Sequence, residues 1–214
     1  MDFSKLKLEV YDIMAVIFPG LLATSEGWVL LKGWTSFIIS LNQLSGTSLL
    51  LLVVFAFGSG HLVQEFSDIT VKSLKGGRYF RRARDRFWVS DEAGPVKVAM
   101  KTSLGTEIAS VDSTYDYCLT KLKDRFVKRD LFVAISDLCR SMAVLSLLAV
   151  VPAARIAWQD VDPSRNHAAV FLVLTALLLL LAVLSWRRMT RFRELSEVTV
   201  FRAYLAVADE RSEK

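Results

Sequence analysis

The feature that most constrains this chain is a run of nineteen residues, 168–186, that contains neither a charged residue nor a proline. As an α-helix this run would be roughly 28 Å long, which matches the hydrocarbon thickness of a bilayer. Buried helices of soluble proteins usually have shorter apolar runs. Hydrophobic residues make up 53% of the whole chain, and its mean hydropathy is +0.37. We therefore expect residues 168–186 to form a transmembrane helix.

Three further apolar runs complete the predicted membrane part, at residues 13–31, 48–63 and 142–158. Pro19-Gly20 is expected to break the first run, and Gly58-Ser59-Gly60 in the second is typical of close helix packing. No cleavable signal peptide is expected, because the apolar stretch after the charged N-terminus lacks a typical cleavage site. The sequence predicts an all-α membrane protein with four transmembrane helices and helical cytoplasmic extensions.

The distribution of lysine and arginine predicts the orientation of these helices. Residues 67–140 hold fifteen of them and residues 187–193 hold four, whereas residues 32–47 and 159–167 hold one each. Loops rich in lysine and arginine stay on the cytoplasmic side of a membrane. We therefore expect both termini, and the segment between the second and third spans, to be cytoplasmic.

These boundaries divide the chain into four segments. Residues 1–66 carry an N-terminal helix and transmembrane helices 1 and 2, and residues 67–140 form a basic cytoplasmic helical segment. Residues 141–186 carry transmembrane helices 3 and 4, and residues 187–214 form a cytoplasmic C-terminal helix. The helical periodicity of both cytoplasmic parts and the absence of alternating strands predict that they contain only α-helices.

The basic segment has a predicted organisation of its own. We expect the second span to continue as a helix to about residue 87, with a break at Gly76-Gly77. Residues 89–95 are expected to form a turn, because they combine acidic residues with glycine and proline. A second helix over 106–139 would then lead into the third span.

The sequence contains no recognisable catalytic or metal-binding constellation. It has two histidines and two cysteines, and it lacks phosphate-loop, nucleophile-elbow and zinc-hydrolase motifs. His61 lies four residues before Glu65, but a structural hydrogen bond at the end of a span is favoured over a metal site. Cys118 and Cys139 are expected to be small buried hydrophobes. We expect no enzymatic activity, no cofactor and no metal.

Basic and aromatic residues occur together in the cytoplasmic segment, farther along the chain than membrane orientation requires. Four explanations remain open: control of topology, attraction to anionic lipid, pairing with the acidic interval 91–116, and binding of a nucleotide or single-stranded nucleic acid. The last explanation requires aromatic rings that stack on bases and cations that hold phosphates. The candidate ligand-binding residues are Arg78, Arg81, Arg82, Arg86, Trp88, Lys121, Arg125 and Lys128.

Three residues of the first span are candidates for a pore or gate. A break at Pro19 and Gly20 would leave carbonyl groups that protein or a water-lined cavity must satisfy. Glu26 is an ionisable residue within a membrane segment, and such residues often mark functional sites. A pair between Glu26 and Arg155 on another helix is the structural alternative.

The order of short motifs along the chain supports a resemblance. Tyr11-Asp12 precedes an apolar stretch containing Phe18-Pro19-Gly20-Leu21-Leu22, and the second span ends near Gly60-His61-Leu62-Val63-Gln64. A basic helical segment follows between the second and third spans. This order resembles bacterial four-span membrane effectors of anti-phage defence operons, in particular the channel effectors of the Hailong system.

The resemblance implies a homo-oligomeric, tetrameric channel in the bacterial inner membrane. It also implies a single-stranded DNA oligomer, made by a partner nucleotidyltransferase, that keeps the channel closed and whose loss depolarises the cell. It identifies no ligand contacts, so the candidate ligand-binding residues follow from the charge argument alone. The alternative is a non-channel membrane scaffold whose basic segment binds anionic lipid or a protein partner.

Overall fold

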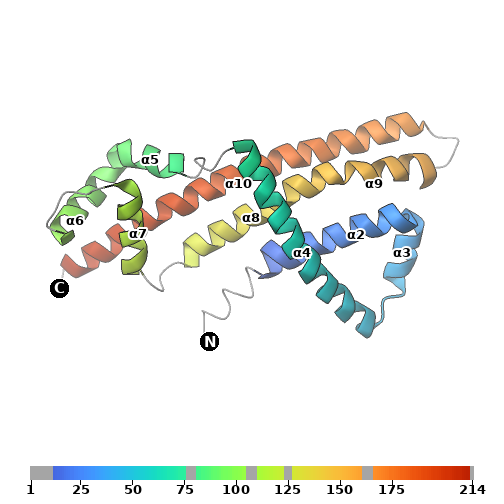
Figure 1. Cartoon of the computed structure of the whole chain (residues 1–214), viewed down its shortest axis with the longest axis horizontal. Coiled ribbons are helices and arrows are strands. Elements are labelled where there is room, and N and C mark those ends of the chain that lie inside the picture. Colours follow the sequence, from blue (N-terminus) through green and yellow to red (C-terminus); the bar gives the residue numbers. More distant parts are fainter. Residues whose placement is uncertain (1–11, 76–80, 105–109, 123–126, 161–165, 213–214) are drawn as a thin grey trace. The chain divides into compact units, whose positions relative to one another are not determined.

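The computed structural model describes residues 12–75, 81–104, 110–122, 127–160 and 166–212. The regular structure of these residues is helical, and they form no strand. The chain divides into two compact units, whose helices are drawn in Figure 1. Unit 1 contains the described residues up to Thr70 together with Ala134–Met189. Unit 2 contains the described residues of Val71–Val133 and those from Thr190 onward.

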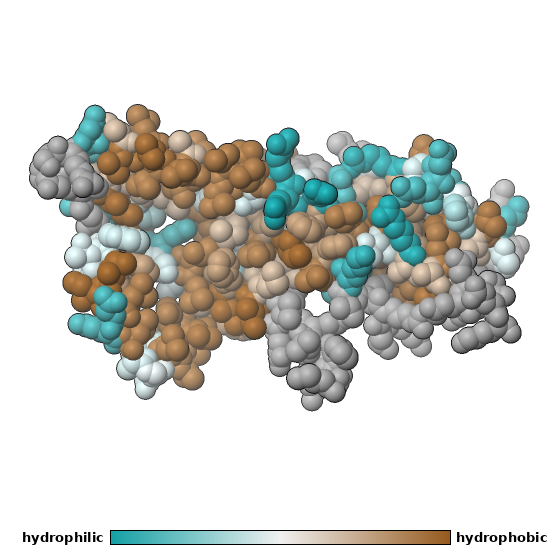
Figure 2. Space-filling view, turned by 180° about the vertical axis from the view of Figure 1, so that it is seen from behind, coloured by the Kyte–Doolittle hydropathy of each residue, from teal (hydrophilic) through white to brown (hydrophobic). Residues whose placement is uncertain are grey.

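Four helical stretches are long and apolar enough to cross a membrane, which confirms the predicted fold class. They are Ile13–Lys32, Gly46–Leu74, Lys128–Gln159 and His167–Ala208. Many of their large apolar side chains are exposed in the single chain, including Phe55 and Leu62 at 68% and 74%. Figure 2 shows hydrophobic side chains gathered over the membrane-spanning helices. Exposure of this extent suits a lipid environment and not water, so the chain is a multi-pass membrane protein.

The first span remains helical where a break was predicted. A π-helix, η1 (Asp12–Ile17), runs directly into the α-helix α2 (Phe18–Lys32), and Pro19 lies in the first turn of α2. Proline has no backbone N–H, and the first turn of a helix is the place where that donor is not needed. The predicted break at Pro19-Gly20 is therefore wrong, because the change from π- to α-helix accommodates the proline.

The hydrogen-bond defect that Pro19 creates is repaired from another helix. Pro19 cannot donate to the carbonyl group four residues earlier, which belongs to Ala15. The side-chain amide of Gln64, on α4 (Gly46–Lys75), donates to the Ala15 oxygen at 2.8 Å. Backbone polar groups within a bilayer need such protein partners because no water is there to replace them.

The backbone of α4 touches that of the first span where they cross, once at α2 and once at the end of η1. A Cβ atom added at Gly20 would lie 1.7 Å from the Ala56 oxygen, and one added at Gly60 would lie 2.1 Å from the Val16 oxygen. The Ser59 hydroxyl oxygen lies 3.1 Å from the Gly20 oxygen. Small residues allow this approach, so the packing role predicted for Gly58-Ser59-Gly60 is confirmed for its last two residues.

A short helix that was not predicted connects these two spans. Gly33 ends α2 with φ of 88° and ψ of 164°, a conformation that L-residues rarely adopt. The helix α3 (Trp34–Asn42) follows directly, and none of its residues is buried. Four residues after α3 the chain enters α4 at Gly46.

The third span contains three consecutive helical pieces. It begins with α8 (Val127–Leu148), continues after a turn at Ala149 as α9 (Val150–Arg155), and ends with the π-helix η3 (Ile156–Asp160). Arg140 connects α8 to α4, because its Nη1 lies 2.8 Å from Asp68 Oδ1. Its Nη2 lies 3.4 Å from Asp137 on α8 itself. These contacts place an ion-pair cluster between the second and third spans.

The fourth span and the predicted C-terminal helix are one helix. The α-helix α10 extends without interruption over His167–Ser212. Within unit 1 it packs on α8, where the Ser136 hydroxyl donates to the Met189 carbonyl oxygen at 3.1 Å. Residues 168–209 contain neither glycine nor proline, so no helix-breaking residue separates the span from the C-terminal helix.

Unit 2 is built from short helices around the C-terminal part of α10. They are α5 (Arg81–Val89), the 3-10 turn η2 (Asp91–Ala93), α6 (Gly94–Leu104) and α7 (Val111–Leu122). The helix α6 was not predicted, although Pro95 at its start suits a helix N-terminus. The predicted helix over 106–139 appears as α7 and α8, and residues 105–109 and 123–126 lie outside the described part. The predicted break at Gly76-Gly77 also lies outside it.

We predict that Gly60→Ala destabilises the membrane unit, because its new Cβ would collide with the Val16 carbonyl group. Overpacking of this kind costs about 1–3 kcal/mol. Thermal unfolding of the purified chain in detergent, followed by tryptophan fluorescence, measures the effect as a lower Tm.

The matched control is Gly58→Ala on the same helix, because a Cβ at Gly58 meets no atom within 4 Å. Both substitutions raise helix propensity equally. Equal Tm values for the two variants would contradict a backbone contact at Gly60.

Candidate functional site

A compact aromatic core in unit 2 positions the candidate site. Phe201 on α10 is fully buried. Its ring stacks on that of Phe87 on α5, with centroids 5.0 Å apart and an interplanar angle of 8°. Tyr115 on α7 meets the same ring edge-on at 5.7 Å. Met100 on α6 is also completely buried in this core. The core therefore holds four helices together and fixes the position of α5 against α10.

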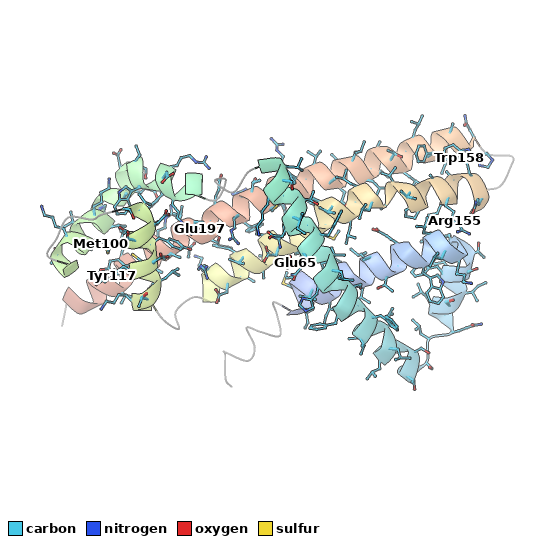
Figure 3. All side chains as sticks on the ribbon, viewed as in Figure 1. Glu65, Met100, Tyr117, Arg155, Trp158 and Glu197 are labelled. Carbon is cyan, nitrogen blue, oxygen red and sulfur yellow. The ribbon has the colours of Figure 1, made fainter. Side chains whose placement is uncertain are left out.

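Arg84 joins three of these helices through partly buried ion pairs. Its Nε donates to Glu197 Oε2 on α10 at 2.7 Å, and its Nη1 donates to Asp112 Oδ1 on α7 at 3.2 Å. The guanidinium carbon lies 3.7 Å from the centroid of the Tyr115 ring. Figure 3 labels Glu197 within this unit, where only 3% of the residue is exposed. Arg84 therefore stabilises the unit and is poorly placed to meet a ligand.

The surroundings of the Arg84 guanidinium favour its charged form. Burial lowers the pKa of Arg84, but the hydrogen bond and charge of Glu197, with smaller contributions from Tyr115 and Asp112, outweigh it, so the pKa is raised. For Tyr115, burial and the Glu197 charge raise the pKa of the phenol, and nearby Arg129 opposes them. The guanidinium stays positive and the phenol stays neutral at physiological pH.

A groove beside this core is the candidate site. It has a volume of about 250 Å³ and lies between α5, η2 and α10. Apolar side chains of Ala83, Phe87 and Val198 contribute to its wall. The remaining lining residues are polar or charged: Arg86, Ser90, Glu92, Glu194 and Arg202.

Two exposed ion pairs join opposite sides of this groove. Arg86 on α5 donates through Nη2 to Glu194 on α10. Arg202 on α10 donates through Nη2 to Glu92 on η2 at 2.7 Å. The side chains of both arginines are more than half exposed, at 67% and 57%. Solvent-exposed pairs contribute only about 0–1 kcal/mol, so an anion can replace a carboxylate here at low cost.

The groove combines what recognition of a phosphate requires. Guanidinium groups bind phosphate oxygens through two parallel hydrogen bonds, and such charge-assisted bonds are stronger than neutral ones. Apolar surface between the two arginines suits a sugar or the face of a base. The volume is smaller than the ~300–1,000 Å³ of typical small-molecule pockets, so it fits one nucleotide unit at most.

Of the predicted ligand-binding residues, the described side chains place only Arg86 in the groove. Trp88 lies on the outside of the core, with its ring 5.8 Å from that of Phe201 and 5.3 Å from Lys97 Nζ. Lys121 lies over Tyr117 on α7, at 5.5 Å from its ring centroid.

The other predicted positions are distributed more widely. Lys128 is exposed near the start of α8. Arg81 and Arg82 lie in α5, but their side chains are outside the described part of the chain, as are Arg78 and Arg125 altogether.

The structure adds residues to the site that the sequence analysis missed. Arg202 and Glu194 both lie on α10, eight residues apart, with Val198 midway between them. Positions spaced by four residues share one face of a helix, and this spacing was visible in the sequence. The partners on α5 and η2 were not visible, because they are 108 and 110 residues away.

The predicted pore residues lie in unit 1. Pro19 and Gly20 are buried in this single chain, and Gly20 faces α4. Among the described residues no ion pair joins Glu26 to Arg155. Arg155 Nη1 instead donates to the backbone oxygen of Leu30, and Figure 3 shows Arg155 on α9 beside α2. The alternative explanation of Glu26 as the partner of Arg155 is therefore wrong.

The described residues contain no group of three potential metal ligands. His61 is exposed and meets the Phe57 ring edge-on, with centroids 4.6 Å apart. Cys118 is completely buried, as predicted, and burial raises the pKa of its thiol to about 12. Cys139 is partly buried.

Comparisons with protein-family models, with curated proteins and with solved structures find no match for this chain. The functional argument therefore rests on the geometry of the groove and of the membrane unit. The resemblance noted from the sequence remains a prediction.

We predict that Glu197→Gln destabilises unit 2 far more than Glu194→Gln. Removing the charge of Glu197 weakens the shorter of the two ion pairs of the partly buried Arg84 guanidinium, while the pair with Asp112 remains. Losing a charge-assisted hydrogen bond of this kind costs about 1.5–3 kcal/mol. Glu194 forms an exposed pair whose loss costs about 0–1 kcal/mol. Thermal unfolding followed by tryptophan fluorescence compares two identical substitutions on one helix. Equal losses of Tm would contradict a structural role for the Arg84–Glu197 pair.

We also predict that Cys118 resists alkylation in the folded chain. An ordinary thiol ionises near pH 9, but the Cys118 thiol stays protonated until about pH 12, and only the thiolate is nucleophilic. In a Cys139→Ala variant, labelling by iodoacetamide should stay slow up to pH 10 and become fast when denaturant unfolds the chain. Rapid labelling of the folded variant at pH 9 would contradict this environment.

Proposed function

We propose that this chain is a ligand-controlled membrane channel whose helical unit 2 binds an anionic ligand in the groove between α5 and α10. The observation that carries the proposal is the pair of exposed arginines, Arg86 and Arg202, on opposite sides of one apolar-walled groove. The ligand class is a nucleotide or a single-stranded DNA oligomer. We place Arg86 and Arg202 in its binding site: Arg86 belongs to the set expected from charge, and Arg202 is added to that set.

The energetics favour exchange of partners in the groove. Each arginine is paired with an exposed carboxylate, Arg86 with Glu194 and Arg202 with Glu92. Hydrogen bonds to charged groups contribute about 1.5–3 kcal/mol, whereas the exposed pairs that would be lost contribute about 0–1 kcal/mol. Contacts of a phosphate with both arginines would therefore be stronger than the exposed pairs they replace, and this difference must offset the loss of translational freedom on binding and the two released carboxylates.

The connection between groove and membrane is the helix α10. Glu194, Val198 and Arg202 lie on the same uninterrupted helix as the fourth span. A ligand that changes which partner Arg202 and Glu194 contact acts directly on this helix. A continuous α-helix transmits rotation and translation along its length, so α10 is the element through which binding would alter the spans.

Oligomerisation would extend the small groove to a longer ligand. One groove accommodates one nucleotide unit at most, but a symmetric assembly repeats it around an axis. Several weak sites on one strand combine into strong binding. We propose a homo-oligomeric, tetrameric channel of the bacterial inner membrane with cytoplasmic termini, as in the anti-phage defence effectors that the sequence resembles. In that scheme a neighbouring nucleotidyltransferase supplies a DNA oligomer that keeps the channel closed.

A direct test measures binding of a fluorescein-labelled single-stranded DNA oligomer to the purified full chain by fluorescence anisotropy. We predict that Arg86→Glu and Arg202→Glu each raise Kd at least tenfold, which corresponds to about 1.4 kcal/mol. Affinity should also fall as salt increases, because phosphate binding releases counterions. Lys101→Glu is the matched control, because it makes the same charge change at an exposed position of α6 outside the groove.

Equal effects of all three substitutions would remove the groove from the proposal. The channel part is tested separately, by expressing the chain in bacteria and following a membrane-potential dye. The channel proposal is supported if the chain depolarises the cells when it is expressed alone, and if co-expression of the DNA-producing partner suppresses this depolarisation. Growth without depolarisation would favour the second candidate, a membrane scaffold whose basic residues bind anionic lipid, which the four arginines directly after the fourth span would support.

A further inference from the structure

A second cavity lies within unit 1, where two spans separate. The helices α2 and α4 touch at Gly20 and Gly60. From this crossing they diverge towards Lys32 and Gly46, and α3 closes the open side of the resulting triangle (Figure 1). Because the close approach at the glycines fixes the crossing, side chains alone must fill the widening gap. They leave a pocket of about 420 Å³.

The lining of this pocket is amphipathic and uncharged. Leu51, Leu52 and Phe55 of α4 contribute apolar wall on one side. On α2, Thr24 and Ser25 also line it, but each hydroxyl donates to a carbonyl of its own helix, at 2.8 Å in both cases. Their polar atoms are thus already satisfied, and the inner wall behaves as an apolar surface.

Polar groups gather at the end of the pocket nearest the connection between the spans. Ser40 and Gln43 come from α3 and its C-terminal cap, and Ser48 comes from the first turn of α4. Among the described residues that line the pocket there is no lysine, arginine, aspartate or glutamate. The cavity therefore has one polar end and one apolar end, as a lipid has.

The helix α3 has the character of a helix that lies in a membrane interface. Its exposed side chains include Trp34, Ile38 and Ile39, at 45%, 38% and 51%. Tryptophan is enriched where bilayer and water meet, and short amphipathic helices lie there with their apolar face in the lipid. The polar end of the pocket is thus at the level of lipid head groups, and its apolar end reaches into the span.

We propose that this pocket binds one acyl chain of a phospholipid. Leu52 and its neighbours would contact the hydrocarbon, and Ser40 and Gln43 would face the ester region. The pocket is continuous with the exposed apolar surface of α4, where Val54 and Phe55 are 61% and 68% exposed, so a lipid can enter it from the bilayer. The pocket volume falls within the ~300–1,000 Å³ typical of ligand sites. The lipid fills the gap between α2 and α4 and holds α3 in the interface.

The test uses the full chain reconstituted in nanodiscs of dioleoyl phosphatidylcholine, then transferred to detergent and analysed by native mass spectrometry. We expect the unaltered chain to retain one phospholipid per chain. Leu52→Trp fills the pocket and should lose this lipid, whereas Leu50→Trp, at a 66% exposed position of the same helix that does not line the pocket, should keep it. Retention of no lipid, or equal retention by both variants, would overturn the proposal.

A second experiment identifies the molecule in the pocket by placing a photoreactive residue at position 52. Unlike Leu52→Trp, this substitution is not chosen to fill the pocket. Illumination after transfer to detergent should produce an adduct of the mass of one phospholipid, several-fold more abundant than with the same residue at position 50. A chain-to-chain cross-link at position 52 in place of the lipid adduct would assign the pocket to a second copy and overturn the proposal. This result is independent of DNA binding and of channel activity.

Discussion

The contact between the backbones of α2 and α4 is the constraint on which the membrane unit depends. Two glycines allow the helices to touch, and the carbonyl oxygens of Ala56 and Val16 occupy the space that a Cβ would need. The same crossing brings Gln64 to the Ala15 carbonyl that Pro19 cannot satisfy. It also forces the two helices apart at their other ends, which creates the pocket that α3 closes. The glycine packing, the Gln64 hydrogen bond and the pocket therefore all result from the crossing of the first span and α4.

Two arginines that are only two residues apart on α5, Arg84 and Arg86, have different roles in unit 2. Arg84 points into the unit, where Glu197 and Asp112 hold it. Arg86 lies at the surface and pairs with an exposed carboxylate. The two partly buried pairs of Arg84 hold three helices together and would be costly to break, whereas the exposed pair of Arg86 is readily exchanged. One face of α5 therefore stabilises unit 2, and the face that carries Arg86 is a candidate binding surface.

The sequence predicted the membrane architecture well because it depends on length and hydrophobicity, which are local properties. It failed where a tertiary partner changes the outcome. Pro19 was expected to break the first span, yet the π-helical turn and Gln64 accommodate it. The helix α6 was missed because its start, Gly94-Pro95, has the composition of a turn. The groove itself was not predicted: of its residues the sequence analysis had selected Arg86 for its charge, but neither Arg202 nor Glu92.

The sequence by itself determined that this chain is a helical membrane protein with four spans, since apolar runs of bilayer length have few other stable environments. It also determined where positive charge accumulates. Only the tertiary structure decided which charges remain available. Arg84 and Glu197 are 113 residues apart, and no local pattern reveals that they meet in a partly buried pair while Arg86 stays exposed. The physical reason is that burial and pairing depend on which helix faces which, and this follows from the packing around Phe201.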